Sequence, residues 1–214
     1  MTKRIYISDN LFLLIKLAYK MFQANNTFGG YHRYVKRVAW ETIHKSKIMN
    51  DGSIPDRAYK KIQWYMVESV FMGEILANLT DHSIIKREKE SLIYLGAIMA
   101  LFDVIIDDFK LEKSVVTELF ENIFLSDKRT IQQNGSAIEK VFYLYLDKLD
   151  NTIEEEHWKE INKHLEIIKF QIQSDEQLRE DITEASADKI TMGKGGVSVL
   201  LCSALLLPTS DSYK

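Results

Sequence analysis

Apolar residues recur along most of the chain at spacings of three and four, and stretches that alternate between apolar and polar residues are few. Spacings of three and four place side chains on one face of an α-helix, whereas alternation is typical of a β-strand. Only two prolines and nine glycines interrupt the pattern in 214 residues. The pattern therefore predicts an all-α protein. We expect helices near residues 8–24, 31–48, 56–80, 84–108, 112–125, 129–149, 153–173, 175–191 and 197–207.

The length suits one domain with a sizeable core, and the chain has no internal repeat, low-complexity tract or proline-rich linker. We therefore predict a single domain over residues 1–214, folded as a helical bundle. Two segments, NNTFGG and NDGSIP, are typical of turns between helices. Thr152 and Glu155 fit a capping box, in which two side chains satisfy free amides at a helix start.

The most informative stretch is LIYLGAIMALFDVIIDDF, residues 92–109. From Leu92 to Ile106 every residue except Asp103 is apolar, glycine or tyrosine. A helix that is apolar on all sides is normally buried on all sides, so this segment should be the central helix of the bundle. Asp103 and Asp107 lie four positions apart and share one face of that helix, whereas Asp108 points away from Asp103.

Two carboxylates on one face of a buried helix need a compensating charge, because burying an ionised carboxylate without a partner costs several kcal/mol. A hard divalent cation supplies that charge, and Mg²⁺ takes carboxylate oxygens, waters and substrate phosphates as ligands. We predict Asp103 and Asp107 as metal ligands. In the alternative interpretation Asp107 and Asp108 end this helix and cap the next one, but no helix end explains Asp103.

A second stretch, DKITMGKGGVSVLLCSALL, contains Gly193, Gly195 and Gly196 where one helical pattern ends and an apolar one begins. Glycines there predict a break that leaves backbone amides free at the start of the following helix. Free amides carry partial positive charge, and Lys189 and Lys194 add formal charge, so the break suits a phosphate. The alternative is an ordinary glycine cap between two helices.

Together, FDVIIDD in an apolar helix and KITMGKGGVS in a broken helix resemble the class I isoprenoid synthase superfamily. The DxxxD spacing is most similar to the squalene and phytoene synthase branch. The resemblance implies a helical bundle around a deep apolar pocket, with Mg²⁺ at its mouth holding a prenyl diphosphate. It implies metal ligation by Asp103 and Asp107, and more weakly by Asp108, and diphosphate contacts at Lys189 and Lys194 beside Gly195 and Gly196.

The implied chemistry is ionisation of an allylic diphosphate to a carbocation in a dry cavity. Phe102 then offers a cation–π contact, and we hypothesise that Met99 limits substrate chain length, the alternative being that Met99 packs as core. The family's second acidic motif is not present, because Asp211 is the only acidic residue beyond Gly196. We therefore expect a C-terminally incomplete chain that lacks its last helices.

The segment GGYHRYVKRVAW carries a basic patch of Arg33, Lys36 and Arg37. We favour a solvated helix face whose aromatic side packs inward, with Arg37 as a minor candidate for a diphosphate contact. A formal net charge of −3 with interleaved signs argues against a nucleic-acid partner. The resemblance leaves a homodimer and peripheral membrane association open.

The lone Cys202 predicts a reducing compartment, and the most apolar run, VSVLLCSALLLP, is shorter than the roughly 20 residues that span a bilayer. We expect a cytoplasmic protein. The predicted function is a Mg²⁺-dependent prenyl diphosphate transferase or synthase. The alternative is a noncatalytic helical binding or scaffold protein whose aspartates are satisfied by internal basic partners.

Overall fold

The computed structural model describes residues 19, 29–39, 41–43, 45–109, 136–163 and 182–206, with the backbone alone at 106–109, 163, 194 and 197. These residues lie in helices or connecting loops and none lies in a strand, which confirms the all-α prediction for this part of the chain. The helices are α2 (Asp56–Leu79), α3 (Lys86–Phe109), α5 (Ala137–Asp150), α6 (Glu155–Lys163) and α8 (Glu184–Ala204). Residues 29–39, 41–43 and 45–46 are also helical and form an N-terminal helical segment.

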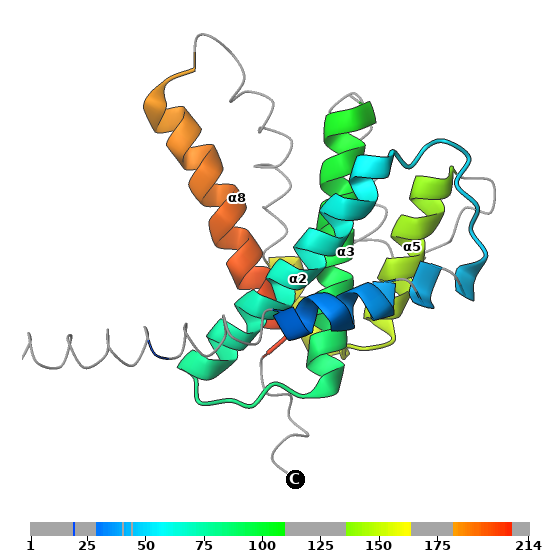
Figure 1. The fold of residues 1–214 in the computed structure, drawn as a ribbon. Coiled ribbons are helices and arrows are strands. Elements are labelled where there is room, and N and C mark those ends of the chain that lie inside the picture. The colour runs from blue at the N-terminus through cyan, green and yellow to red at the C-terminus, as the bar shows by residue number, and fades with distance from the viewer. Residues whose placement is uncertain are drawn as a thin grey trace, which may run out of the picture.

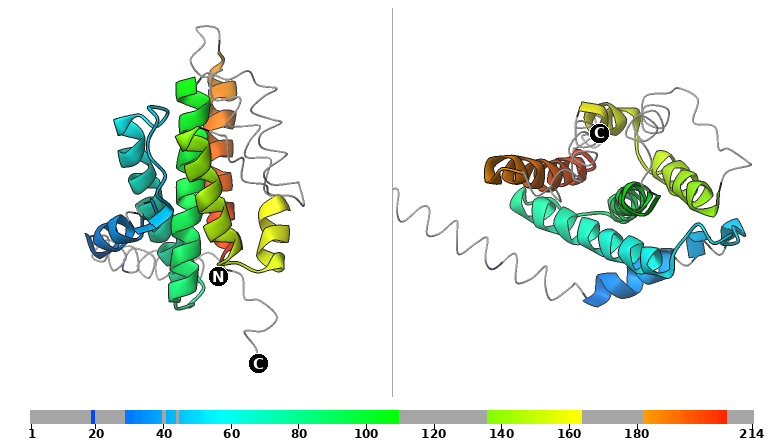
Figure 2. Two further views of the ribbon diagram at one scale, coloured as in Figure 1. Left: turned by 90° about the vertical axis from the view of Figure 1, so that its right-hand side faces the viewer. Right: turned by 90° about the horizontal axis from the view of Figure 1, so that it is seen from above.

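α3 is the central helix, as its apolar sequence predicts. Seen from above, it stands end-on with α2 on one side and α5, α6 and α8 around the others (Figure 2). The N-terminal helical segment crosses the outer side of α2 (Figure 1). Between Leu92 and Ile105 every residue is buried except Met99, which is half-buried. The core of the bundle therefore forms around this stretch of α3.

Two glycines let α2 and α3 pack closely. A Cβ atom added at Gly96 of α3 would lie 2.6 Å from the backbone oxygen of Tyr65 and 2.9 Å from the Cα atom of Met66, both on α2. At Gly73 of α2, an added Cβ would instead overlap the side chain of Leu92. Because α2 runs against the α3 backbone at Gly96, side chains on the facing side of α2 reach α3 directly. This close approach positions the site described below.

Two predicted helices in the first half of the chain have bounds that agree with the structure, whereas the predicted starts of later helices do not. The predictions of 56–80 and 84–108 are confirmed by α2 and α3. The predicted helix 129–149 was wrong at its start, because Ser136 has extended backbone angles and α5 begins at Ala137. The predictions for 8–24 and 112–125 lie outside the described residues apart from Tyr19, which is helical.

α6 begins at Glu155 and not at 153, and the predicted capping box at Thr152 was wrong. The Thr152 hydroxyl donates to the carbonyls of Lys148 and Leu149 and so belongs to the end of α5. The predicted helix 175–191 cannot extend back through Thr183, which is extended and caps α8 by accepting a hydrogen bond from the Ser186 amide. The spacing of polar residues in the sequence is compatible with more than one helix start. The geometry of the preceding loop determines which start the chain uses.

The start of α5 is capped by a loop from far earlier in the chain. Asp51 accepts a hydrogen bond from the Ala137 amide at 2.9 Å, and the Ser53 hydroxyl accepts one from the Ile138 amide at 3.1 Å. Gly52 between them has a φ of 94°, a left-handed angle that favours glycine. Amides in the first turn of a helix have no partner within the helix, so these side chains supply the missing acceptors.

We predict that the contribution of Asp51 to stability is lost only in strong acid. Hydrogen bonds from Ser53 and from the Ala137 amide lower the pKa of Asp51 from 3.8 to about 2. A pKa lowered by folding stabilises the fold above the unfolded value and stops doing so as the pH falls through the folded value. In urea unfolding, wild type should exceed Asp51→Asn in stability at pH 7, with the difference shrinking from pH 4 to pH 2. A difference that does not depend on pH would contradict the assignment.

Candidate functional site

Asp103 is the charged residue most deeply placed in the described core, with 6% of its surface exposed. Two side chains from α2 contact its Oδ2 atom: the Lys61 ammonium forms an ion pair with it, and the Tyr65 hydroxyl donates a hydrogen bond at 3.1 Å. Lys61 and Tyr65 lie one helical turn apart, which puts both on the side of α2 that faces α3. The contacts supply the charge and the hydrogen bond that a buried carboxylate requires.

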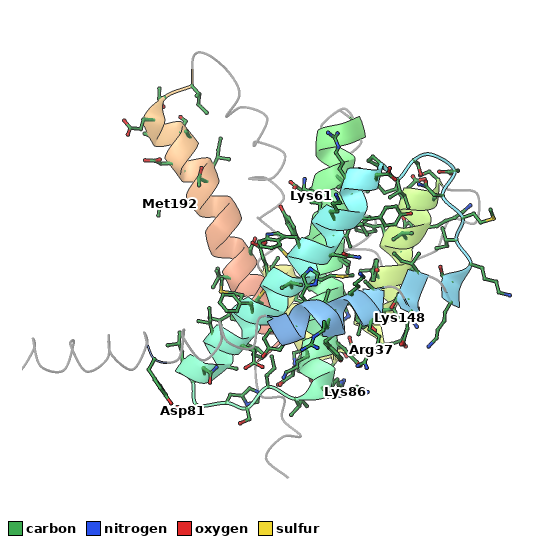
Figure 3. All side chains as sticks on the ribbon, viewed as in Figure 1. Arg37, Lys61, Asp81, Lys86, Lys148 and Met192 are labelled. Atoms are coloured by element: carbon green, nitrogen blue, oxygen red, sulfur yellow. The ribbon has the colours of Figure 1, made fainter. Side chains whose placement is uncertain are left out.

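The two charged side chains of the Asp103 site differ in how far they are exposed to solvent. The Asp103 side chain is 9% exposed, whereas the Lys61 side chain is 31% exposed. Lys61 lies toward one end of the bundle, where α2 passes α3 (Figure 3). Lysine commonly buries its methylene stem while its ammonium stays near water, so the carboxylate is linked to solvent through this residue.

The other predicted metal ligands, Asp107 and Asp108, lie on the last turn of α3, and their side chains are outside the described residues. Among the residues that are described, no group of three or more histidine, cysteine, aspartate or glutamate side chains is arranged to hold a metal ion. A Mg²⁺ site at Asp103 would therefore need further ligands from beyond these residues. The prediction of metal ligation stays a prediction.

Met99 and Phe102 lie close to Asp103 along α3. Phe102 is buried, with 7% of its surface exposed, and Met99 is half-buried against the core. This packing agrees with the alternative that Met99 packs as part of the hydrophobic core. Its proposed effect on substrate length stays a prediction, as does the cation–π role of Phe102.

The predicted helix break at Gly193, Gly195 and Gly196 was wrong, because α8 is one continuous helix from Glu184 to Ala204. Lys189, Gly195 and Gly196 are exposed, and the side chain of Lys194 is outside the described residues. No described hydrogen bond or ion pair connects Lys189 to Asp103. Met192 is 75% exposed and projects from the side of α8 that faces away from α2 and α3 (Figure 3). The backbone amides that a break at these glycines would have left free lie inside α8.

We expect Gly195→Ala to stabilise the protein by about 1 kcal/mol, because glycine in an exposed helix is less favourable than alanine by that amount. An added Cβ atom at Gly195 meets nothing within 4 Å. Thermal unfolding followed by circular dichroism measures the change. Destabilisation would mean that Gly195 has a backbone conformation alanine cannot adopt, and hence that the helix is broken there.

Arg37 lies on the N-terminal helical segment and is exposed, with its guanidinium 5.4 Å from the ring centroid of Tyr34. In Figure 3 it lies toward the Lys86 end of α3, away from Lys61. Arg33 and Lys36 are also exposed, whereas Val35 and Ala39 are buried. Tyr31 and Tyr34 are half-buried and pack against the core. These exposures confirm the prediction of a solvated face whose aromatic side packs inward. The structure does not bring Arg37 to Asp103.

Sequence reasoning missed Lys61 and Tyr65. The available signal was their spacing on α2: Ala58, Ile62 and Met66 are buried, so Lys61 and Tyr65 flank the buried face of an amphipathic helix. A lysine in that position can reach either solvent or a buried acceptor on a neighbouring helix. Which acceptor it meets depends on how α2 packs on α3, and no local pattern contains that information.

Comparisons with family models, with curated proteins and with solved structures find no match to the chain. Among the described helices, none combines the length and the apolar character needed to cross a bilayer. Of the two motifs that carry the resemblance to isoprenoid synthases, the structure removes the broken helix at KITMGKGGVS. The resemblance therefore rests on FDVIIDD alone.

Proposed function

We propose that the chain binds a prenyl diphosphate together with Mg²⁺ where α2 meets α3 and ionises it. The observation that carries the proposal is Asp103, an ionisable carboxylate that is 6% exposed within the central helix and lies before the last turn of that helix, where no helix end requires it. Its connection to solvent through Lys61, which is 31% exposed, supports access by a charged ligand. Apolar residues that pack in the core lie on both sides of the carboxylate along α3.

The donor chemistry of the site fits a divalent cation in part. Asp103 offers carboxylate oxygen, the ligand type that Mg²⁺ prefers, and the Tyr65 hydroxyl holds that carboxylate in one orientation. Asp107 would be the second carboxylate on the same helical face. A bound divalent cation would supply Lewis-acid stabilisation of the diphosphate leaving group. The chain's own apolar core would exclude water from the reacting carbon.

The test is Mg²⁺-dependent diphosphate release from geranyl, farnesyl and geranylgeranyl diphosphates. We expect release by the wild type, its loss on chelation of Mg²⁺, and a decrease of about 100-fold or more in Asp103→Asn, which removes a ligand charge. Asp147→Asn is the matched control, since Asp147 is exposed on α5. No release by the wild type, with no binding of the diphosphates, would overturn the proposal.

A noncatalytic scaffold is the second candidate. The contacts with Lys61 and Tyr65 favour it, because they compensate the buried Asp103 charge without any metal. On this reading the ion pair specifies how α2 packs on α3, a role that buried polar groups have in some proteins. Strong coupling between Lys61 and Asp103 in stability measurements, together with a wild type that neither binds nor cleaves prenyl diphosphates, would favour the scaffold.

A further inference from the structure

Asp51 and Gly52 form an exposed aspartyl–glycyl bond in the loop that joins the N-terminal helical segment to α2. The side-chain carboxyl group of an aspartate can react with the backbone amide of the next residue. Glycine favours this reaction, because it has no Cβ atom and its backbone reaches conformations that other residues avoid. The protonated carboxyl group is the reactive form, because it loses water where a carboxylate would have to lose an oxide ion.

The folded loop engages both reacting groups of this bond. Oδ1 of Asp51 accepts a hydrogen bond from the Ser53 amide at 3.0 Å, and Oδ2 accepts one from the Ala137 amide of α5 at 2.9 Å. The Gly52 amide donates a hydrogen bond to Oδ1 of Asn50 at 3.0 Å. Hydrogen bonds from Ser53 and Ala137 lower the pKa of Asp51 to about 2, so its carboxyl group is ionised at neutral pH. The fold thus disfavours the reaction at both the carboxyl carbon and the amide nitrogen.

We propose that Asp51 is a site of aspartyl isomerisation controlled by α5: the bond is stable while the first turn of α5 packs beside the loop, and it reacts when that turn separates. In the separated loop the Gly52 nitrogen bonds to Cγ of Asp51, and the carboxyl hydroxyl leaves with the amide proton as water. The product is a succinimide ring. Water then adds to one of its two carbonyl carbons and reopens the ring, to aspartate or to isoaspartate, without any oxidant, reductant or cofactor.

Isomerisation of Asp51 would prevent α5 from packing as before. The isomer carries its main chain through Cβ and Cγ, which lengthens the backbone by a methylene group and leaves the carboxylate on Cα. A carboxylate in that place no longer matches the amides of Ser53 and Ala137. The Ser53 hydroxyl, which caps the Ile138 amide, is displaced with it. Because isomerisation removes the contacts that prevented it, the loop converts a temporary separation of α5 into a lasting one. This inference does not depend on the proposed function.

The first experiment compares the full chain in native buffer with the same chain unfolded in guanidinium chloride, both at neutral pH. Trypsin releases Asp51 in the peptide of residues 48–57, which follows Lys47 and ends at Arg57. Isoaspartate separates from aspartate by chromatography at unchanged mass, whereas deamidation of Asn50 changes the mass. We expect the folded chain to form isoaspartate at least about tenfold more slowly, because modification of a locally opened state follows the population of that state. Equal rates, or no isoaspartate in the unfolded chain, would overturn the proposal.

Ala137→Pro tests the contact with α5 directly. Ala137 is the first residue of α5, a position that accepts proline, and Ser136 has the extended angles φ −60° and ψ 162° that suit the residue before a proline. The variant removes the amide proton that binds Oδ2 of Asp51, so we expect isoaspartate to form about tenfold faster than in wild type. Glu184→Pro is the matched control, because it places proline at the first residue of α8 and should leave the rate unchanged.

Ser53→Ala covers the case in which Ala137→Pro does not fold by circular dichroism. It removes the hydroxyl that caps the Ile138 amide and contacts Asp51, so isomerisation should again be faster than in wild type. A wild-type rate in a folded variant of either kind would overturn the control by α5. Hydrogen exchange on the purified isoaspartyl protein then measures the consequence: the amides of Ala137 and Ile138 should exchange faster than in the unmodified protein. Unchanged exchange would mean that the modified loop still caps α5, which contradicts the proposal.

Discussion

Replacing Gly96 by alanine is expected to lower the free energy of unfolding by about 3 kcal/mol, a large cost for one added methyl group. The new Cβ atom would lie 2.6 Å from the backbone oxygen of Tyr65, a distance that real Cβ atoms essentially never show. A backbone atom cannot rotate away as a side chain can, so α2 and α3 must move apart along their contact. That loss exceeds the roughly 1 kcal/mol that alanine gains in helix propensity.

Gly73→Ala is the matched control for this prediction. Its added Cβ atom would meet the Leu92 side chain, which can change its rotamer. We therefore expect a cost of about 1 kcal/mol or less once helix propensity is included. Urea unfolding of both variants measures the difference. Equal costs would mean that the helices yield as easily at Gly96 as at Gly73, and that the tight approach at Tyr65 does not position the site.

The second large effect concerns the buried ion pair. Asp103→Leu should lower the free energy of unfolding by about 2–3 kcal/mol, because Lys61 loses its partner but can still reach water. Lys61→Met should lower it by about 3–4 kcal/mol, because the carboxylate charge stays buried without its partner. The double variant Lys61→Met/Asp103→Leu should return to within about 1 kcal/mol of wild type, since apolar groups replace the pair. The measurement is a double-mutant cycle in urea.

An exposed ion pair provides the control cycle. Lys45 and Glu41 are 3.6 Å apart with side chains 78% and 53% exposed, and pairs of this kind couple by less than about 1 kcal/mol. Glu41→Gln and Lys45→Met should therefore be nearly additive. If the Lys61–Asp103 cycle is as nearly additive as this one, the carboxylate is not held by Lys61, and the candidate site as described would be wrong.

The fold was predictable from sequence where the pattern of apolar residues depends only on local geometry. The continuous apolar run around Ala97 and Leu101 predicts a central helix, and the structure buries both residues completely. The anomaly of Asp103 within that run was also visible, since a lone carboxylate stands out against apolar neighbours. Its partners were not, because contact between Lys61 and Asp103 depends on the packing of two helices.

The error at α8 has a different cause. Glycine permits a break without requiring one, at a cost to a helix of about 1 kcal/mol each. α8 is anchored at one end by the Thr183 cap and at the other by buried residues including Leu201 and Leu205. Anchoring at both ends can offset the propensity cost of the glycines between them. The low helix propensity of Gly195 and Gly196 is visible in the sequence. The burial of Leu201 and Leu205 that offsets it is known only from the tertiary structure.

The loop that caps α5 has a consequence for the order in which the chain folds. The amides of Ala137 and Ile138 find their acceptors on Asp51 and Ser53, 86 and 85 positions earlier. Closing so long a loop costs entropy before any contact is gained, so the first turn of α5 should become protected late. During synthesis, Asp51 and Ser53 leave the ribosome well before the amides they cap. The side chains that cap α5 are therefore synthesised before the helix itself. The first turn of α5 gains these hydrogen-bond acceptors only when it packs beside the earlier loop.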